Sequence, residues 1–216
     1  MTVAQSFQRA RKPEEISQRR ETLLAAAAEL FDVEGPQGAG LNAIAAKAGF
    51  TKSNVYRYFE SREQVLLELF RDEFAGLVDA AVAALAQVPM GDTPALAEAI
   101  TDCFLARPRC CALISILAST LEQNVSEVTI AATKTHIGAQ NARVVAALSA
   151  RMPSADPADC AWAIAMIGSL LAGMWPGAHP PPAAQAVLAR PEYAHLRMDV
   201  ARDLKRAAVA LLASVG

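Results

Sequence analysis

Apolar side chains recur every three or four residues along most of this 216-residue chain, and this spacing constrains the fold more than any other feature. It is the period of one face of an α-helix, whereas a half-buried strand alternates every second residue. Alanine and leucine supply most of the surplus in a composition that is 53% hydrophobic and only 6% aromatic, and both favour helix. No segment has the pattern of a strand. The sequence therefore predicts an all-α fold with a substantial core.

Three helices are predicted in the first sixty residues. Residues 1–12 are polar and basic without an apolar period, which predicts a flexible basic arm. An amphipathic helix then covers residues 13–34, and Gly35 and Pro36 end it. Its inner face is expected to hold Ile16, Leu23, Ala27, Leu30 and Phe31. We assign residues 13–60 to one small domain.

The next two helices are short and are joined by a tight turn. The first covers residues 41–47, and Gly49 permits the turn that follows it. Thr51 is suited to cap the second helix, which is expected to reach Phe59. On that helix Val55, Tyr58 and Phe59 share a packing face, while Lys52, Ser53 and Tyr56 share the opposite face. Two short helices with one polar face free form a helix-turn-helix, which places its second helix in the major groove of DNA.

A second, larger helical domain is predicted over residues 61–216. Ser61 and Gln64 have the spacing of a capping box, and they open a long apolar-periodic helix. Further helices are expected over residues 93–106, 108–124, 126–151, 159–175 and 198–213, with a proline-rich loop before the last one. The charge-free segment 160–175 is shorter than the ~20 residues of a membrane span, and Pro176 is expected to end it. We interpret this segment as a buried helix and expect no membrane contact.

Charge and cysteine usage exclude several functions. The net charge is −2, so any nucleic-acid surface depends on local segregation of basic residues. Such segregation occurs in residues 1–20 and again in residues 40–62. The four cysteines lack zinc-site spacing and no signal peptide precedes the first helix, which indicates a reducing cytoplasm. No catalytic motif is recognisable, so we expect no enzyme, no cofactor and no metal.

The run LNAIAAKAGFTKSNVYRYFESRE, from Leu41 to Glu63, closely resembles the DNA-binding domain of the tetracycline-repressor (TetR) family. The resemblance covers roughly residues 16–70. Its elements are Leu41, Ile44 and Ala45 in the second helix, then Gly49-Phe50-Thr51-Lys52, Val55-Tyr56-Arg57-Tyr58-Phe59 and Ser61-Arg62. One departure is Gly40, which occupies a place that the family usually gives to a hydroxyl residue that caps the second helix and meets phosphate.

The resemblance implies that this chain binds double-stranded DNA with the polar face of the third helix. Base-edge contacts specify sequence, whereas phosphate contacts position the protein. We assign Asn42, Lys52, Ser53 and Asn54 to base edges, and Thr51, Tyr56, Tyr58 and Arg62 to the phosphate backbone. The alternatives are that Tyr58 is a core aromatic side chain, and that Lys47 and Arg57 are ordinary solvated charges.

The resemblance also implies a homodimer that is released from a palindromic operator by a small-molecule effector, and thus a repressor. Helices 159–175 and 198–213 would form the dimer interface. The first of them has a small-residue seam of Ala161, Ala165, Gly168 and Ala172, for which the alternative is packing within one chain. The candidate effector-pocket residues are Phe70, Phe74, Phe104, Cys111, Glu122, Asn124, His136 and Trp175. His136 is alternatively a surface or capping residue. A rival hypothesis is a thiol or metal sensor that uses Cys110 and Cys111 with Cys103 or His136.

Overall fold

The computed structural model describes residues 13–216, and this part of the chain is helical and contains no strand. The all-α prediction is therefore confirmed, while the predicted basic arm over residues 1–12 lies outside the described residues. The chain divides into two compact units, one ending at Val65 and the other beginning at Leu66. The boundary falls within α4 (Arg62–Leu85).

The N-terminal unit is built on three helices and the first turn of α4. The three are α1 (Pro13–Gly38), α2 (Leu41–Lys47) and α3 (Lys52–Val55). Gly35 has non-helical dihedral angles, φ 69° and ψ −165°, so α1 is interrupted at the position predicted for its end. The small core of this unit contains the fully buried side chains of Leu23, Ile44, Val55 and Phe59. Burial of Ile44 and Ala45 on α2 confirms the inner face of that helix.

The helix predicted to extend from Thr51 to Phe59 is shorter than expected. It ends at Val55, and the next residues continue as a tighter turn. The amide of Arg57 donates to the carbonyl of Asn54 at 3.2 Å, and that of Tyr58 donates to the carbonyl of Val55 at 2.9 Å. These are i to i−3 bonds, which commonly finish short α-helices. The turn still directs Phe59 into the core.

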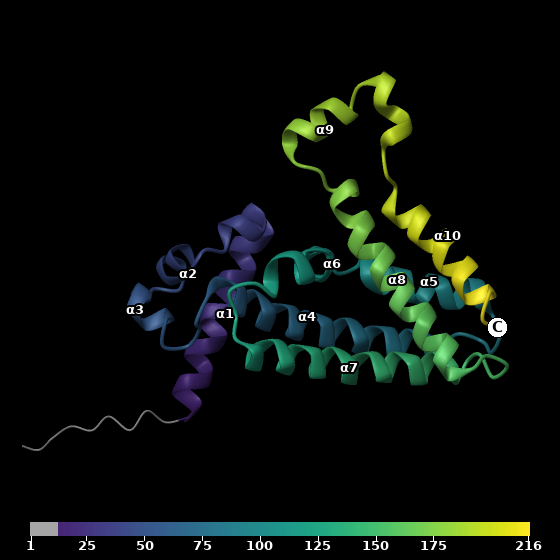
Figure 1. The fold of residues 1–216 in the computed structure, drawn as a ribbon, viewed down its shortest axis with the longest axis horizontal. Coiled ribbons are helices and arrows are strands. Elements are labelled where there is room, and N and C mark those ends of the chain that lie inside the picture. Colours follow the sequence, from purple (N-terminus) through teal and green to yellow (C-terminus); the bar gives the residue numbers. More distant parts are fainter. Residues whose placement is uncertain (1–12) are drawn as a thin grey trace, which may run out of the picture. The chain divides into compact units, whose positions relative to one another are not determined.

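The C-terminal unit packs its helices in two groups (Figure 1). In sequence order after α4 they are α5 (Thr93–Leu105), α6 (Pro108–Ile116), a π-helix (Leu117–Leu121), α7 (Glu127–Ser149), α8 (Pro157–Ala178), α9 (Pro182–Leu188), a 3₁₀ helix (Pro191–Leu196) and α10 (Val200–Ala213). Helix α7 runs beside the part of α4 that belongs to this unit, and an Arg143–Asp79 ion pair at 2.7 Å joins the two helices. Helix α10 packs against α5 and α8, and α8 also contacts α6 and α7.

Side-chain caps explain why four of these helices begin where they do. Asp92, Ser126, Asp156 and Asp199 each accept a hydrogen bond from a backbone amide in the first turn of α5, α7, α8 and α10 respectively. A capping side chain satisfies one of the amides that have no partner within the helix. Ser126 caps the helix expected to begin at residue 126, with an amide-to-oxygen distance of 3.3 Å.

Three predicted elements differ from the structure. The helix predicted over residues 108–124 ends as an α-helix at Ile116 and widens into the π-helix. Pro176 does not end α8, which continues to Ala178; Pro176 is exposed and lies in the last turn, where few hydrogen bonds depend on its missing N–H. The predicted proline-rich loop contains α9 and the 3₁₀ helix, both without a buried residue.

Helix α8 also differs from the expectation in length. With 22 residues it is long and apolar enough to cross a membrane by length and composition alone, as is the strongly bent α5–α6 pair if taken as one span. Core helices of soluble proteins pass the same test. In α8 the buried face, which contains Cys160, Ala163, Ile167, Leu171 and Trp175, packs within this unit.

Candidate functional site

The turn between α2 and α3 determines where the polar face of α3 lies. Gly49 has φ +72°, in the left-handed region that side chains with a Cβ rarely adopt. The amide of Phe50 then donates to the carbonyl of Ala45 at 2.9 Å, which closes the turn. Val55 is fully buried on the opposite side of α3. The two short helices and the tight turn thus form the predicted helix-turn-helix.

The residues assigned to base edges are mostly exposed. Asn42, Lys52 and Ser53 are exposed and Asn54 is half-buried. Thr51 stands at the N-cap position of α3, but its side chain makes no capping bond. Its hydroxyl instead lies 3.1 Å from the Ser53 hydroxyl. Thr51, Lys52, Ser53 and Asn54 form the N-cap and first turn of α3, whose amides add positive potential.

Lys52 and Tyr56 are paired on the outer face of α3 and the turn that follows it. The Lys52 Nζ lies 5.8 Å from the centroid of the Tyr56 ring, a cation–π distance. Tyr56 is 52% exposed. The pair thus presents a cation and a phenolic hydroxyl together at the surface.

Tyr58 lies differently from Tyr56. Its hydroxyl is buried and has no hydrogen-bond partner among the described residues. Its carbonyl accepts a bond of 3.1 Å from Arg20 Nη1, and the Arg20 guanidinium lies 4.7 Å from the centre of the Phe59 ring. Arg20 therefore connects α1 to the turn that follows α3, at Tyr58 and Phe59. Sequence reasoning counted Arg20 only among the basic residues and missed this positioning contact.

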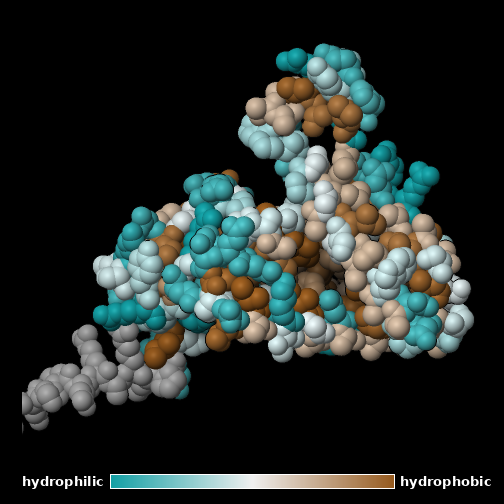
Figure 2. Space-filling model, in the orientation of Figure 1, coloured by the Kyte–Doolittle hydropathy of each residue, from teal (hydrophilic) through white to brown (hydrophobic). Residues whose placement is uncertain are grey.

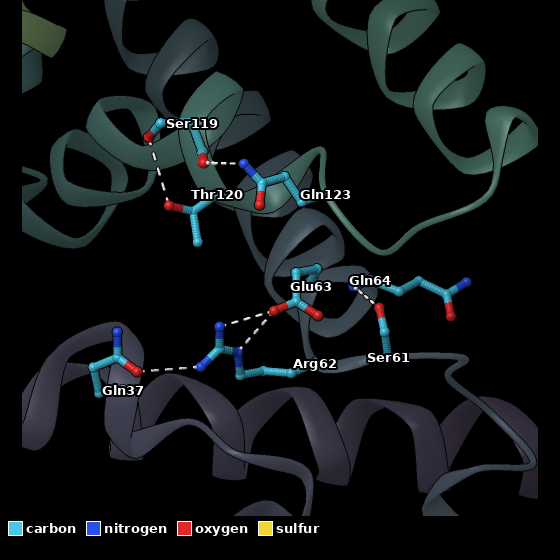
Figure 3. Close-up of polar contacts among 8 residues, drawn as sticks. All are labelled: Gln37, Ser61, Arg62, Glu63, Gln64, Ser119, Thr120 and Gln123. Carbon is cyan, nitrogen blue, oxygen red and sulfur yellow. Dashed lines mark hydrogen bonds and ion pairs between the residues drawn. The ribbon is translucent and has the colours of Figure 1, made fainter.

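Arg62 opens α4 and is held by neighbours within the N-terminal unit (Figure 3). Its Nε and Nη2 donate to Glu63 Oε1 at 3.1 and 2.8 Å, and its Nη1 lies 3.5 Å from Gln37 Oε1. Glu63 is buried, so the pair is partly shielded from water. The predicted capping box is present in shifted form: the Gln64 amide donates to Ser61 Oγ at 3.1 Å, while the Gln64 side chain accepts from the Glu60 amide at 2.6 Å.

Two further positions of the motif have defined surroundings. Lys47 forms an ion pair of 2.7 Å with Glu29 on α1, and both side chains are exposed. Gly40 is the N-cap of α2 and, lacking a side chain, makes no capping bond. The departure noted in the sequence is therefore a missing cap in the structure.

The C-terminal unit contains a small apolar pocket with a cavity volume of about 30 Å³, which becomes about 370 Å³ when the adjoining space open to solvent is included. Four helices line it: α4 contributes Phe74, Leu77, Val78 and Ala81, α5 contributes Ile100 and Phe104, α7 contributes Asn141 and Val144, and α8 contributes Ile164. Six of these nine side chains are buried, and Phe104, Asn141 and Ile164 are half-buried. The enclosed part has room for about one or two water molecules, so a small-molecule ligand would also occupy the open part of the pocket.

Only Phe74 and Phe104 of the eight candidate pocket residues line this pocket. The other six have structural contacts elsewhere. Phe70 stacks on Phe74 at 5.3 Å, and Trp175 stacks on His179 at 4.0 Å. Cys111 donates a hydrogen bond to the Phe104 carbonyl, Glu122 forms an ion pair with Lys134, and His136 hydrogen-bonds the Arg71 carbonyl. Asn124 has a positive φ of 56°. The role of His136 as a ligand-binding group thus has no support from its position.

Sequence reasoning missed seven residues of the pocket. Leu77, Val78 and Ala81 continue the face of α4 that holds Phe74, one helical turn further along, so the helical period was the available signal. Asn141 is the one polar side chain in the lining. A polar residue facing the core side of a helix is the pattern that would have pointed to it.

The cysteines of α6 are poorly suited to thiol chemistry. Burial raises the pKa of the Cys111 thiol to about 12. Burial raises that of Cys110 further, and the neighbouring Cys111 and Glu73 add to the effect. A protonated thiol is a poor nucleophile and a poor metal ligand. Among the described residues no group of three His, Cys, Asp or Glu side chains is placed to hold a metal ion.

Helix α8 has an exposed, mainly apolar face, and its one charged residue is Asp159 in the first turn. Trp162 is 46% and Leu170 39% exposed, and the small residues Ala161 and Ala165 of the predicted seam are exposed beside them. Apolar surface is visible over this unit in Figure 2. One face of α8 packs within the chain, as the alternative interpretation expected, and for the open face the dimer interface stays a prediction.

The fold and the exposed polar face of α3, which we call the reading surface, define a helix-turn-helix protein. Comparison with known proteins identifies its family. Residues 23–69 match the bacterial regulatory proteins of the tetR family, and residues 71–213 match the tetracyclin repressor-like C-terminal domain. The chain belongs to the TetR family of transcriptional regulators, which are DNA-binding proteins and not enzymes. Repression and release by an effector are typical of this family.

Individual relatives agree with this assignment. An uncharacterized HTH-type transcriptional regulator of Bacillus subtilis, YdgC, is 45% identical over 53 residues, which are 24% of this chain and 27% of that protein. The similarity thus spans about a quarter of the relative. In fold, the chain is similar to a putative transcriptional regulator from Rhodococcus sp. RHA1 (TM-score 0.62, 16% identity, 91% of this chain and 94% of the other). It is also similar to the fatty acid degradation regulator FadR from Bacillus halodurans (TM-score 0.57, 16% identity, 90% and 94%).

Proposed function

We propose that this chain is a cytoplasmic homodimeric repressor that binds a palindromic operator through α2 and α3 and leaves it when a small molecule fills the C-terminal unit. The exposed Lys52–Tyr56 pair beside the α3 N-terminus carries the DNA-binding part of the proposal. Lys52, Ser53, Asn54 and Asn42 read base edges, and Thr51, Tyr56, Tyr58 and Arg62 hold phosphates.

Tyr56, Tyr58 and Arg62 differ in how far each side chain must move to contact a phosphate. Tyr56 presents its hydroxyl at the surface, so it contacts phosphate without rearrangement. The buried hydroxyl of Tyr58 must turn outward, and Arg62 must exchange Glu63 for a phosphate oxygen. Tyr56 is therefore the principal backbone anchor of the three.

Dimerisation follows from the open face of α8. One helix-turn-helix reads only a few base pairs, and two heads one DNA turn apart require two copies of the chain. The mainly apolar face with Trp162 and Leu170, which has Asp159 at its N-terminal end, suits an isologous contact between identical helices. Helix α10 packs beside α8 and completes the interface.

Selection of bound fragments from genomic DNA, followed by fluorescence anisotropy on the selected duplex, tests the proposal. Lys52→Ala and Tyr56→Ala should each weaken binding about 10-fold, since one phosphate or base contact contributes about 1–3 kcal/mol. Lys134→Ala and Tyr193→Ala are matched controls in the C-terminal unit and should retain wild-type affinity. Wild-type affinity in both α3-region variants, or no duplex bound at low salt, would contradict the proposal.

A further inference from the structure

The lining of the C-terminal pocket carries information about the chemistry of its ligand. None of the nine residues that line the pocket carries a charge. Eight have apolar side chains and the ninth is Asn141. A charged ligand group moved into such a site loses its hydration and meets no counter-charge, which is strongly unfavourable.

The charged residues nearest in sequence to the lining are bound to each other. Asp79, next to Val78 on α4, pairs with Arg143, which is next to Val144 on α7. Glu73, next to Phe74, pairs with Arg109 on α6 at 2.7 Å. These residues hold α4 to α7 and to α6, so their charges are already compensated within the protein.

The pocket is also polarised along its depth. The lining residues of α4, together with Ile100 and Val144, are buried, whereas Phe104, Asn141 and Ile164 are half-buried and mark the opening. The one polar side chain thus stands where the pocket meets its surroundings. Its amide supplies both a donor and an acceptor.

We propose that the effector is an uncharged, mainly apolar molecule whose single hydroxyl or carbonyl group bonds to Asn141 at the pocket opening while its apolar part fills the space beside Val78 and Ala81. This inference rests on the proposed function for the meaning of "effector", but the ligand preference itself is a property of the C-terminal unit. Neutral alcohols, esters and ketones fit the site, and carboxylates and amines of the same length do not.

Isothermal titration calorimetry with 1-octanol, octanoate and octylammonium at pH 7.5 tests the preference at constant chain length. Octanol should bind about 100-fold more tightly than either ion. Asn141→Leu should weaken octanol binding about 5- to 10-fold and leave octane binding unchanged or stronger. Thr135→Leu adds the same side chain at an exposed position of α7 and should change neither ligand's affinity.

Filling the pocket provides a second variant: Ala81→Phe should abolish octanol binding, and its helical content is checked by circular dichroism. Ions that bind as well as octanol, an unchanged octanol affinity in Asn141→Leu, or no octanol binding up to its solubility limit would overturn the inference. DNA affinity is measured on the same preparations without ligand. If the protein prefers octanol to the two ions but binds no DNA, only the proposed function is overturned. If it binds DNA but shows no preference for octanol, only this inference is overturned.

Discussion

The two units of this protein carry their candidate sites in opposite ways. In the N-terminal unit most of the candidate side chains are exposed and all are polar, and buried apolar residues hold them in place. In the C-terminal unit the candidate pocket is the space that apolar side chains leave unfilled. A reading surface can therefore be recognised from residue types at fixed spacing, whereas a pocket depends on how well several helices pack.

The largest effect is expected from a new charge on the open face of α8, which tests whether the C-terminal unit supports DNA binding through dimerisation. Trp162→Glu should weaken dimerisation at least about 100-fold, because each copy would bury an unpaired carboxylate in a symmetric interface. DNA affinity should fall by a similar factor although none of the residues that we propose to contact DNA has changed. Sedimentation velocity at several concentrations measures the first effect and anisotropy the second.

Val128→Glu is the control for that experiment. Val128 is an apolar residue of α7 that is 79% exposed, so the same charge there should be tolerated. A Trp162→Glu protein with the wild-type dimer constant would show that the open face of α8 is not the interface.

Gly49 offers a comparison between the two units at the level of the backbone. Gly49→Ala should cost about 1–2 kcal/mol, since a Cβ residue is strained at φ +72° although nothing lies within 4 Å of the new atom. DNA affinity should fall about 5- to 30-fold if the strain displaces α3. Urea unfolding and anisotropy measure the two losses.

Gly91 is a matched control because it has φ +76° in the C-terminal unit and the same open surroundings. Gly91→Ala should lose a similar amount of stability and retain full DNA affinity. Equal losses of DNA affinity in the two variants would mean that general destabilisation explains both.

The Arg62–Glu63 pair tests whether the reading surface is partly neutralised in the free protein. Glu63→Gln removes the carboxylate that holds Arg62, so DNA affinity should rise about threefold at low salt and the salt slope should steepen by about 1. Anisotropy titrations at about 50 to 200 mM salt, the range in which counterion release changes the affinity strongly, measure both the affinity and the salt slope.

Glu73→Gln changes the corresponding arginine partner in the C-terminal unit, where Arg109 is the cation. That variant should leave the salt slope unchanged. A Glu63→Gln protein that binds DNA less well would instead indicate that Glu63 orients Arg62 for its phosphate.

The sequence predicted local features of the fold better than features that depend on packing. The bounds of α2, the turn at Gly49 and the caps at Ser61 and Ser126 each depend on a few neighbouring residues, and all are present. The end of α3, the π-helix and the continuation of α8 through Pro176 depend on tertiary contacts that override local preference.

The same distinction applies to the sites. Exposure of Lys52 and Tyr56 follows from the position of Val55 and Phe59 on the opposite face, so a helical period predicts it. Which of the apolar residues of α4 face a void cannot be read from one helix, because the void is defined jointly by α4, α5, α7 and α8. Six of the eight candidate aromatic and polar residues therefore lie outside the lining of this particular pocket.

The smallest effect is expected at Gly40, where the reading unit lacks a cap that its family usually has. Its carbonyl already accepts the first bond of α2 from the Ile44 amide at 2.9 Å, its φ is −73°, and nothing lies within 4 Å of an added Cβ. Gly40→Ser should therefore raise the free energy of unfolding by about 0.3–1 kcal/mol, and Gly40→Ala should lower it because alanine is a poorer cap than glycine. Urea unfolding of the three proteins measures this order, which isolates the hydroxyl from the loss of backbone freedom in the unfolded chain. If alanine stabilises as much as serine, the gain comes from the unfolded state and α2 does not need a cap to hold α3 against DNA.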